Sequence, residues 1–336
     1  MDLVTVWFVL IAALWIGFFF LEGFDFGVGA LSLLTGRDDA ERREMLATIG
    51  PVWDADEAWL VTGGIAIFAA FPLWYAAVFP AAYLPLMLVV ACLIVRGVAV
   101  EYRSKKPEHR WRAAWDVAIG VSSILLATLF GVFWAGMLHG IPIDASGAFT
   151  GQSLLSFING YSVLGGVTLL LFSLAHGASF VALKTDGELS RRQARLATWL
   201  ALATTVAMLL FSIWTFVAYT DGDAGALALG VAAVVAIAGA AVAHRRGRHL
   251  WGFWLDAVAV AGFVGQIFLG LYPNALPSTT AGGFSLTLAD AAASENSLVL
   301  ITVVALVGLP LVITYQAWSF WVFRGRLRRE EFLVEN

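Results

Sequence analysis

The chain has 336 residues, of which 60% are hydrophobic and 13% are charged, whereas an ordinary soluble domain carries about 25% charged residues. So few charges could not cover the surface of a soluble protein, and the composition therefore excludes a soluble enzyme, a nucleic-acid binder and a disordered chain. The formal net charge of −4 is too small to indicate the charge of a partner. The sequence predicts a protein that crosses a membrane several times.

Nine runs of residues are apolar and long enough to cross a bilayer, which takes about 20 residues in a helix. The first run is not expected to be a cleavable signal peptide, because it opens with MDLVTVW, without a basic segment, and has no small-residue cleavage site after a short apolar core. We therefore expect an all-α membrane protein with nine transmembrane helices, over approximately 4–34, 57–79, 81–101, 114–138, 157–183, 196–219, 224–243, 252–272 and 297–323.

The basic residues predict how the chain is oriented in the membrane. Lys and Arg fall almost entirely in the connections after the first, third, fifth and seventh spans and in the tail, and the other connections have none. Since cytoplasmic loops carry the excess of Lys and Arg, this pattern places the N-terminus outside and the C-terminus in the cytoplasm. The one exception is Arg96, which lies within the third span.

A weak internal repeat links the first and the fifth spans. The segments LEGFDFGVGALSLLTGRDDAERR and LAHGASFVALKTDGELSRRQAR both have a polar residue followed by Gly, and both lead into a loop with paired arginines. A parallel repeat of this kind fits two helix bundles of the same orientation. We expect a first four-helix unit over 1–138, a second over 139–272, and an outer loop, a peripheral ninth helix and a basic tail over 273–336.

Charged residues inside the first three spans are the candidates for function, because a charge in hydrocarbon is costly and usually faces the interior of a bundle. Glu22 and Asp25 are three residues apart and share one helix face, and Asp54 and Glu57 repeat this spacing in GPVWDADEAWL. Together with Arg96 they form either a neutralised structural network or a chain along which protons move from the cytoplasm towards the membrane centre. The excess of carboxylates over bases favours the relay, because some of the carboxylates must be protonated or solvated.

Other residue types give weaker signals. His176 is the histidine expected well inside a span, and since a bis-histidine haem needs two at matching depth, the chain is not expected to bind haem by itself. The single Cys92 excludes a disulfide framework and a thiolate zinc site, and the sequence has no metal-ligand spacing, phosphate loop or nucleophile elbow. Gly23 and Gly27, and the pair Gly63-Gly64, are interpreted as close contacts between helices.

Four segments in order, over nearly the full chain, resemble subunit II of the cytochrome bd-type quinol oxidases. One departure from the family pattern is Asp56, where the W-D-x-N motif more usually has Asn. The matching segments are EGFDFGVG (22–29), GPVWDADEAWL (50–60), RGVAVEYRS (96–104) and YPNALPSTT with FSLTLADAAAS in the outer loop (272–294).

The resemblance implies a subunit of a bacterial cell-membrane complex that oxidises quinol on the outer side and reduces dioxygen to water. Such a complex takes protons from the cytoplasm and so generates a proton-motive force without pumping. The resemblance further implies that three haems, two b-type and one d-type, belong to the partner subunit I, which pairs with this chain through a pseudo-twofold interface. Small single-span subunits are further candidate partners, and the chain is implied to provide an oxygen route and to hold a structural quinone.

By the same resemblance, Asp54 of the W-D motif is the best candidate for a proton path, with Asp25 and Arg96 beside it and Glu57 and Glu22 as further members. No catalytic residue and no metal ligand is expected in this chain.

The sequence leaves two alternatives open. One is a proton-coupled secondary transporter with Asp25, Asp54 and Arg96 at its coupling site, although the repeat is parallel rather than inverted and the spans lack paired Gly or Pro breaks. The other is a purely structural assembly partner. The sequence also does not decide between ubiquinone and menaquinone, or whether Arg96 pairs with Asp54 or with Glu101.

Overall fold

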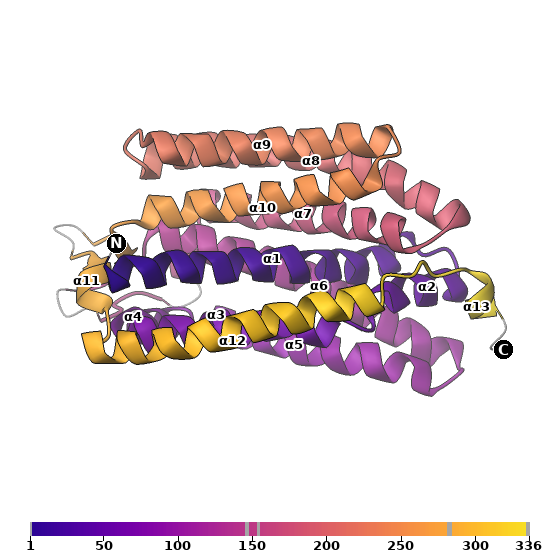
Figure 1. Ribbon diagram of the computed structural model, residues 1–336, viewed down its shortest axis with the longest axis horizontal. Helices are drawn as coiled ribbons and strands as arrows, with labels where there is room; N and C mark the ends of the chain where they lie inside the picture. Colours follow the sequence, from indigo (N-terminus) through magenta and orange to yellow (C-terminus); the bar gives the residue numbers. More distant parts are fainter. Residues whose placement is uncertain (1, 145–147, 153–154, 281–283, 334–336) are drawn as a thin grey trace.

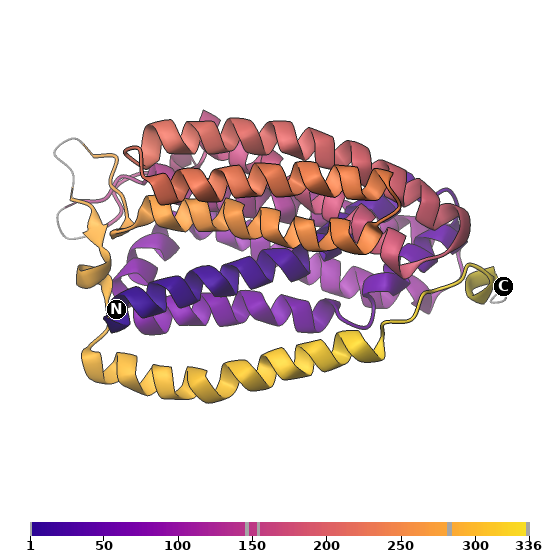
Figure 2. The ribbon, with the colours of Figure 1, turned by 45° about the horizontal axis from the view of Figure 1, so that its top comes forward.

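The computed structural model describes residues 2–144, 148–152, 155–280 and 284–333. Within these residues the chain forms a bundle of long, roughly parallel helices, with the start of α1 at one end and α13 at the other (Figures 1 and 2). A two-stranded antiparallel ribbon, β1 with β2, lies in the loop over 272–294, of which 281–283 fall outside the described residues. The elements are α1 (Leu3–Thr35), α2 (Asp39–Ile49), α3 (Trp53–Ala70), α4 (Pro72–Ala81), α5 (Tyr83–Tyr102), η1 (Arg103–Lys105), α6 (His109–His139), η2 (Leu155–Phe157), α7 (Gly160–Lys184), α8 (Gly187–Tyr219), α9 (Ala224–Arg245), α10 (His249–Leu271), β1 (Asn274–Leu276), β2 (Leu286–Thr287), α11 (Leu288–Ala291), α12 (Glu295–Val322) and α13 (Glu330–Leu333).

Eight helices of the described part are long and apolar enough to cross a membrane, namely α1, α5, α6, α7, α8, α9, α10 and α12. They overlap eight of the nine predicted spans. The expectation of one continuous helix over 57–79 is wrong, because α3 ends at Ala70 and α4 begins at Pro72. Phe71 between them has φ −133° and ψ 68°, outside the helical region, since a proline disfavours the helical conformation in the residue before it.

The helices differ widely in how deeply they are buried. In the most apolar stretch of α7, 72% of the residues are buried, whereas the corresponding share in α12 is 6%. The ribbon views agree, with α8 and α9 on one face of the bundle and α12 on the opposite face (Figures 1 and 2). The core therefore lies around α7 and α10, with α6 and α1 beside them, and α12 is peripheral.

The close contact of α1 with α7 depends on glycine. A Cβ atom added to Gly27 would lie 1.9 Å from the carbonyl oxygen of Ser173, and one added to Gly177 would lie 2.5 Å from the carbonyl carbon of Gly27. Small residues allow backbones to approach in this way, so the interpretation of Gly27 as a close helix contact is confirmed. It is wrong for Gly64, because nothing lies within 4 Å of a Cβ added there.

Polar contacts at three levels attach the peripheral helix α12 to the bundle. The Ala293 amide, just before α12, donates to the Ala70 carbonyl at 2.8 Å, which is one of the carbonyls left free by the break after α3. The indole of Trp7 donates to the Thr302 hydroxyl at 2.9 Å. Nearer the other end of α12, the Gln316 amide donates to Asp56 of α3.

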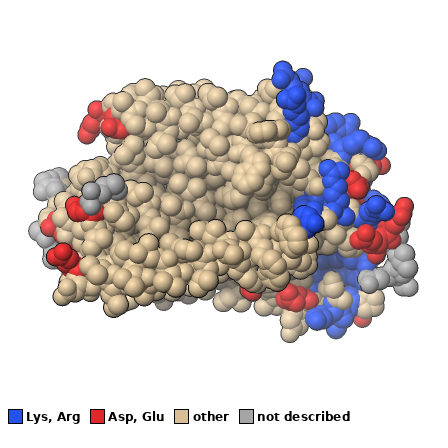
Figure 3. All heavy atoms as spheres, in the orientation of Figure 1, with Lys and Arg blue, Asp and Glu red and all other residues tan. Residues whose placement is uncertain are grey.

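Lys and Arg side chains gather at one end of the molecule, the end that carries α2 and α13, and we call it the basic end (Figures 1 and 3). At this end the expected loop over 35–50 contains the helix α2, which the sequence analysis missed. Asp38 caps α2 by accepting from the Glu41 amide at 2.8 Å, a frequent arrangement at helix N-termini.

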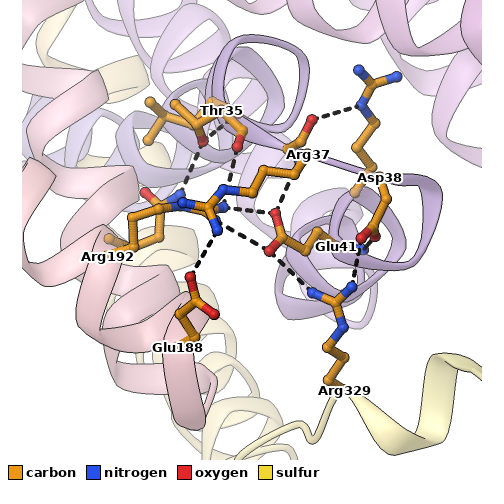
Figure 4. Close-up of polar contacts among 11 residues, drawn as sticks. Thr35, Arg37, Asp38, Glu41, Glu188, Arg192 and Arg329 are labelled. Carbon is orange, nitrogen blue, oxygen red and sulfur yellow. Dashed lines mark hydrogen bonds and ion pairs between the residues drawn. The ribbon is translucent and has the colours of Figure 1, made fainter.

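An ion-pair network centred on Glu41 joins three parts of the chain at the basic end (Figure 4). The Glu41 carboxylate binds Arg192 of α8 at 2.7 Å and Arg329 of the C-terminal segment at 3.0 Å. Burial alone would raise the pKa of Glu41, but hydrogen bonds from Arg192 and from the Arg37 amide hold its pKa below the ordinary value. Glu41 is therefore a charged carboxylate whose ion pairs connect α2 with α8 and with the segment after α12.

Glu44, one turn further along α2, is a buried carboxyl with no hydrogen-bond partner on either oxygen among the described residues. Burial raises the pKa of Glu44 from 4.5 to about 7; Arg329 opposes this effect, and the carboxylates of Glu41 and Asp38 add to it. Because the folded state holds this proton more tightly than the unfolded state, Glu44 lowers stability progressively as the pH rises from about 4.5 to 7.

We expect Glu44→Gln to stabilise the protein by a few degrees in melting temperature at pH 8 and by less at pH 5. The measurement is thermal unfolding of the assembled complex across this pH range, with the exposed Glu108→Gln as a control that leaves the curve unchanged. A melting-temperature gain from Glu44→Gln that is equal at both pH values would contradict the assignment.

Candidate functional site

Four buried ionisable side chains converge between α1, α3 and α5, and we call them the acidic cluster. Glu22 and Asp25 come from α1, Asp56 from α3 and Arg96 from α5. The three acids are 0% exposed and Arg96 is 2% exposed. The cluster therefore concentrates charge in the interior of the bundle.

Arg96 is the single base of the cluster and is fixed mainly by Glu22. Its two terminal nitrogens bind the two oxygens of Glu22 at 2.6 and 3.2 Å, and one of them lies 3.9 Å from Asp25. The guanidinium carbon is also 5.0 Å from the centre of the Phe26 ring, in reach of a cation–π contact. The open question of its partner is thereby answered: Arg96 pairs with Glu22, not with Asp54 or Glu101.

Asp25 and Asp56 are less well satisfied. No described residue other than Asp56 lies within hydrogen-bonding reach of the Asp25 carboxyl, and Asp56 itself also accepts from Gln316 of α12. Three acids thus face one guanidinium in a site shielded from water. Three ionised carboxylates beside one guanidinium would leave uncompensated negative charge there, so the arrangement requires that some of these acids be protonated or solvated.

The α3 helix presents its acidic residues to different sides. Asp56 points into the cluster, Glu57 is half-buried and within the electrostatic influence of Arg96, and Asp54 is exposed. Successive exposed positions continue from Asp54 along the same face of α3 to Val61 and Ile65. Asp54 is therefore a carboxylate at the end of an otherwise apolar outward face.

The structure brings together three of the five predicted site residues, Glu22, Asp25 and Arg96, with Glu57 at their edge and Asp54 outside. Sequence reasoning missed Asp56 as a cluster member and did not find Gln316. A signal for Asp56 was present, because residues two apart on a helix point to nearly opposite sides. One of Asp54 and Asp56 therefore had to face inward.

His176 of α7 lies apart from the acidic cluster. Its Nδ1 is 3.3 Å from Asp256 of α10 and its Nε2 is 3.0 Å from the Phe20 carbonyl. Both ring nitrogens are thus engaged, and the described residues hold no group of three or more His, Cys, Asp or Glu that could bind a metal.

Comparison with known proteins identifies the family. The sequence model of the family described as cytochrome bd terminal oxidase subunit II matches residues 3–323. The chain belongs to this family. It is 39% identical to cytochrome bd ubiquinol oxidase subunit 2 of Bacillus subtilis (strain 168) over 329 residues, which cover 97% of each chain. It is 32% identical to cytochrome bd-I ubiquinol oxidase subunit 2 of Escherichia coli (strain K12), with 97% of this chain and 95% of that one covered.

The fold has a counterpart among solved structures. The structure of bd oxidase from Geobacillus thermodenitrificans superposes with a TM-score of 0.75 at 18% identity, over 96% of this chain and 99% of that chain. This similarity shows the fold, and the predicted family is confirmed by the family model and the two sequence relatives. The chain is a membrane-embedded subunit of a respiratory quinol oxidase, a haem-containing bd-type complex in which it has subunit I as its partner.

Proposed function

We propose that the acidic cluster and Asp54 form a proton path. Through it this subunit supplies protons for the reduction of dioxygen to water in subunit I. The observation that carries the proposal is the excess of three buried carboxylates over one guanidinium, because acids in such an excess are protonated or solvated and can then pass protons on. At about 1.5 Å per residue, Asp25 lies roughly 18 Å along the chain from Arg37 at the basic end. Protons that enter at the basic end would have to cross this distance to reach Asp25 in the interior of the bundle.

The orientation that this path needs has the basic end in the cytoplasm and the N-terminus outside. The gathering of Lys and Arg at one end of the molecule supports it (Figure 3). With α3 and α4 together making one crossing, the chain would cross nine times, with four-helix units over 1–138 and 139–272 and the remainder over 273–336. Residues 1, 145–147, 153–154, 281–283 and 334–336 of these ranges fall outside the described part.

The outward face of α3 is the surface that we assign to subunit I. It is apolar except at Asp54, and a partner that covers it would bury this carboxylate at the subunit interface. Glu57 lies between Asp54 and the cluster and would connect them. The three haems, two b-type and one d-type, would then reside in subunit I, and protons would cross to them at Asp54.

A second feature supports a role for small apolar molecules. A cavity of about 360 Å³ between α1, α3, α4, α5 and α6 is lined almost entirely by apolar side chains such as Trp15, Trp74 and Phe130. Such a cavity fits a quinone or dioxygen, and we propose that it serves one of them. Quinol would be oxidised on the outer side of the bacterial plasma membrane, and single-span accessory subunits would find room at the peripheral α12.

We expect Asp54→Asn to lower quinol-dependent oxygen consumption about tenfold or more, because it removes a group that takes up and releases protons. The activity is measured on a complex purified through a tag on this chain, with its haem content verified by the reduced-minus-oxidised spectrum. Glu101→Gln, at another exposed carboxylate near the basic end, is the matched control and should retain full activity.

Other outcomes would favour other functions. Full activity of Asp54→Asn in an assembled, haem-loaded complex would contradict the proton path and leave a structural assembly partner. The absence of haem from material purified under mild detergent would favour a proton-coupled transporter. Haem in this chain expressed alone would contradict the assignment of the haems to subunit I and direct attention to His176 and His139.

A further inference from the structure

A pocket of about 520 Å³ lies at the basic end of the second unit. Two of the helices that form it, α8 and α9, lie on the opposite side of the bundle from α12 (Figure 1). It is formed by the first turns of α8, the end of α9 and the start of α10. Three arginines line it, Arg191, Arg195 and Arg245, together with His244 and His249. No Asp or Glu is among its lining residues.

The charge of this pocket is uncompensated. Among the described residues, no side chain or backbone acceptor pairs with the guanidinium groups of Arg191, Arg195 and Arg245. The contrast with the adjacent Arg192 is direct, because Arg192 binds Glu41 at 2.7 Å. His244 is 4% exposed, and its Nε2 also has no partner. The pocket thus concentrates positive charge without an anion from the described part of the chain.

The wall of the pocket changes character along α8. Arg191 and Arg195 are one turn apart on the same helix face, and Thr198, Trp199 and Leu202 continue that face towards the middle of the membrane. Trp199 is 71% exposed and Leu202 is 37% exposed. Over roughly 16 Å the surface therefore passes from guanidinium through hydroxyl to aromatic and aliphatic groups.

This order matches the parts of one kind of molecule. A phospholipid has a phosphate at the membrane surface, a glycerol ester below it and acyl chains below that. Basic pockets between helices on the cytoplasmic side bind anionic lipid head groups, and exposed tryptophan is typical of the interface between head groups and hydrocarbon. A free anion would use the arginines but not the exposed apolar wall.

We propose that this pocket binds an anionic phospholipid, with its phosphate on Arg191, Arg195 and Arg245 and an acyl chain along Trp199 and Leu202. The lipid would fill the space between α8, α9 and α10 at the basic end. It would bind on the side of the subunit away from the face assigned to subunit I.

The test uses the delipidated complex of this chain with subunit I in neutral detergent, and native mass spectrometry to count bound phosphatidylglycerol during a titration. We expect Arg191→Gln/Arg195→Gln to weaken binding about tenfold or more, since each basic residue near the surface contributes on the order of 1 kcal/mol. The control Arg246→Gln/Arg248→Gln removes the same charge from neighbouring positions that do not line the pocket, and should bind the lipid as the unmodified complex does.

Two further probes separate the sources of phosphate. Phosphatidylcholine with the same acyl chains should bind weakly, and inorganic phosphate should not displace phosphatidylglycerol at millimolar concentration. Trp199→Ala, which keeps every arginine, should also weaken lipid binding. Equal binding of phosphatidylglycerol by the double variant and the control would overturn the proposal. So would equal binding of phosphatidylcholine, or displacement by inorganic phosphate, which would identify a site for a free anion.

Discussion

Gly27→Leu is expected to reduce the yield of assembled complex at least severalfold. The first side-chain carbon would lie 1.9 Å from the Ser173 carbonyl oxygen, which belongs to the backbone of α7 and cannot turn aside. The substitution therefore forces α1 and α7 apart along a buried contact, a larger disturbance than ordinary overpacking, which costs about 1–3 kcal/mol. The yield is measured as haem absorbance recovered per amount of membrane through a tag on this chain.

Gly308→Leu is the matched control, because it makes the same change in the peripheral helix α12, where nothing lies within 4 Å of the added Cβ. This variant should assemble at close to the normal yield. A Gly27→Leu complex that assembles and melts as the unmodified one would show that α1 and α7 can separate without loss, and would contradict the glycine contact as a requirement of the fold.

Arg96→Met is expected to destabilise the complex by about 3–5 kcal/mol, because it leaves the Glu22 carboxylate buried without its cation. The loss is read from thermal or denaturant unfolding, followed by haem release from the complex. Arg248→Met, at an exposed arginine with no ion pair to any described residue, serves as the control and should have little effect.

The double variant Arg96→Met/Glu22→Leu separates the ion pair from the rest of the cluster. Replacing both members of a buried pair by apolar residues is often neutral, so the double variant should recover most of the stability. A double variant as unstable as Arg96→Met alone would show that Arg96 acts mainly through Asp25 or Phe26, and not through Glu22.

Part of this site could be predicted from sequence, because helix geometry fixes which residues share a face. Glu22 and Asp25 are three residues apart in a long apolar run, so both had to point to one side. Arg96 was the single basic residue inside a span. These three side chains do meet in the structure. The family could be predicted too, because short motifs occur in the expected order along the chain.

The choice between Asp54 and Asp56 could not be made in the same way. The two residues point to nearly opposite sides of α3, but the apolar residues around them do not show which side faces protein and which faces lipid or a partner. The rotation of α3 is fixed by its packing on α1 and by Gln316, which lies 260 positions later in the chain. A contact of that separation leaves no local pattern.

Two features of the fold were missed for different reasons. The break at Phe71 was marked by Pro72, but a sum of hydropathy over the run does not register one proline. The helix α2 is polar enough to resemble a loop, and its buried residues, such as Met45 and Ile49, find their cover only when the neighbouring helices assemble. Both departures depend on backbone geometry or tertiary contact more than on composition.

The attachment of α12 has a consequence for extraction from the membrane. Lipid and detergent tails can replace an apolar neighbour at almost no cost, but in hydrocarbon they offer no substitute for a hydrogen bond. The contacts of Ala293 with Ala70, of Trp7 with Thr302 and of Gln316 with Asp56 are hydrogen bonds, which lipid and detergent tails cannot replace. We therefore expect α12 to keep its rotation and depth in the bundle when detergent replaces the lipid around it. Residues on its outward face can vary, provided that the hydrogen bonds of Ala293, Thr302 and Gln316 are kept.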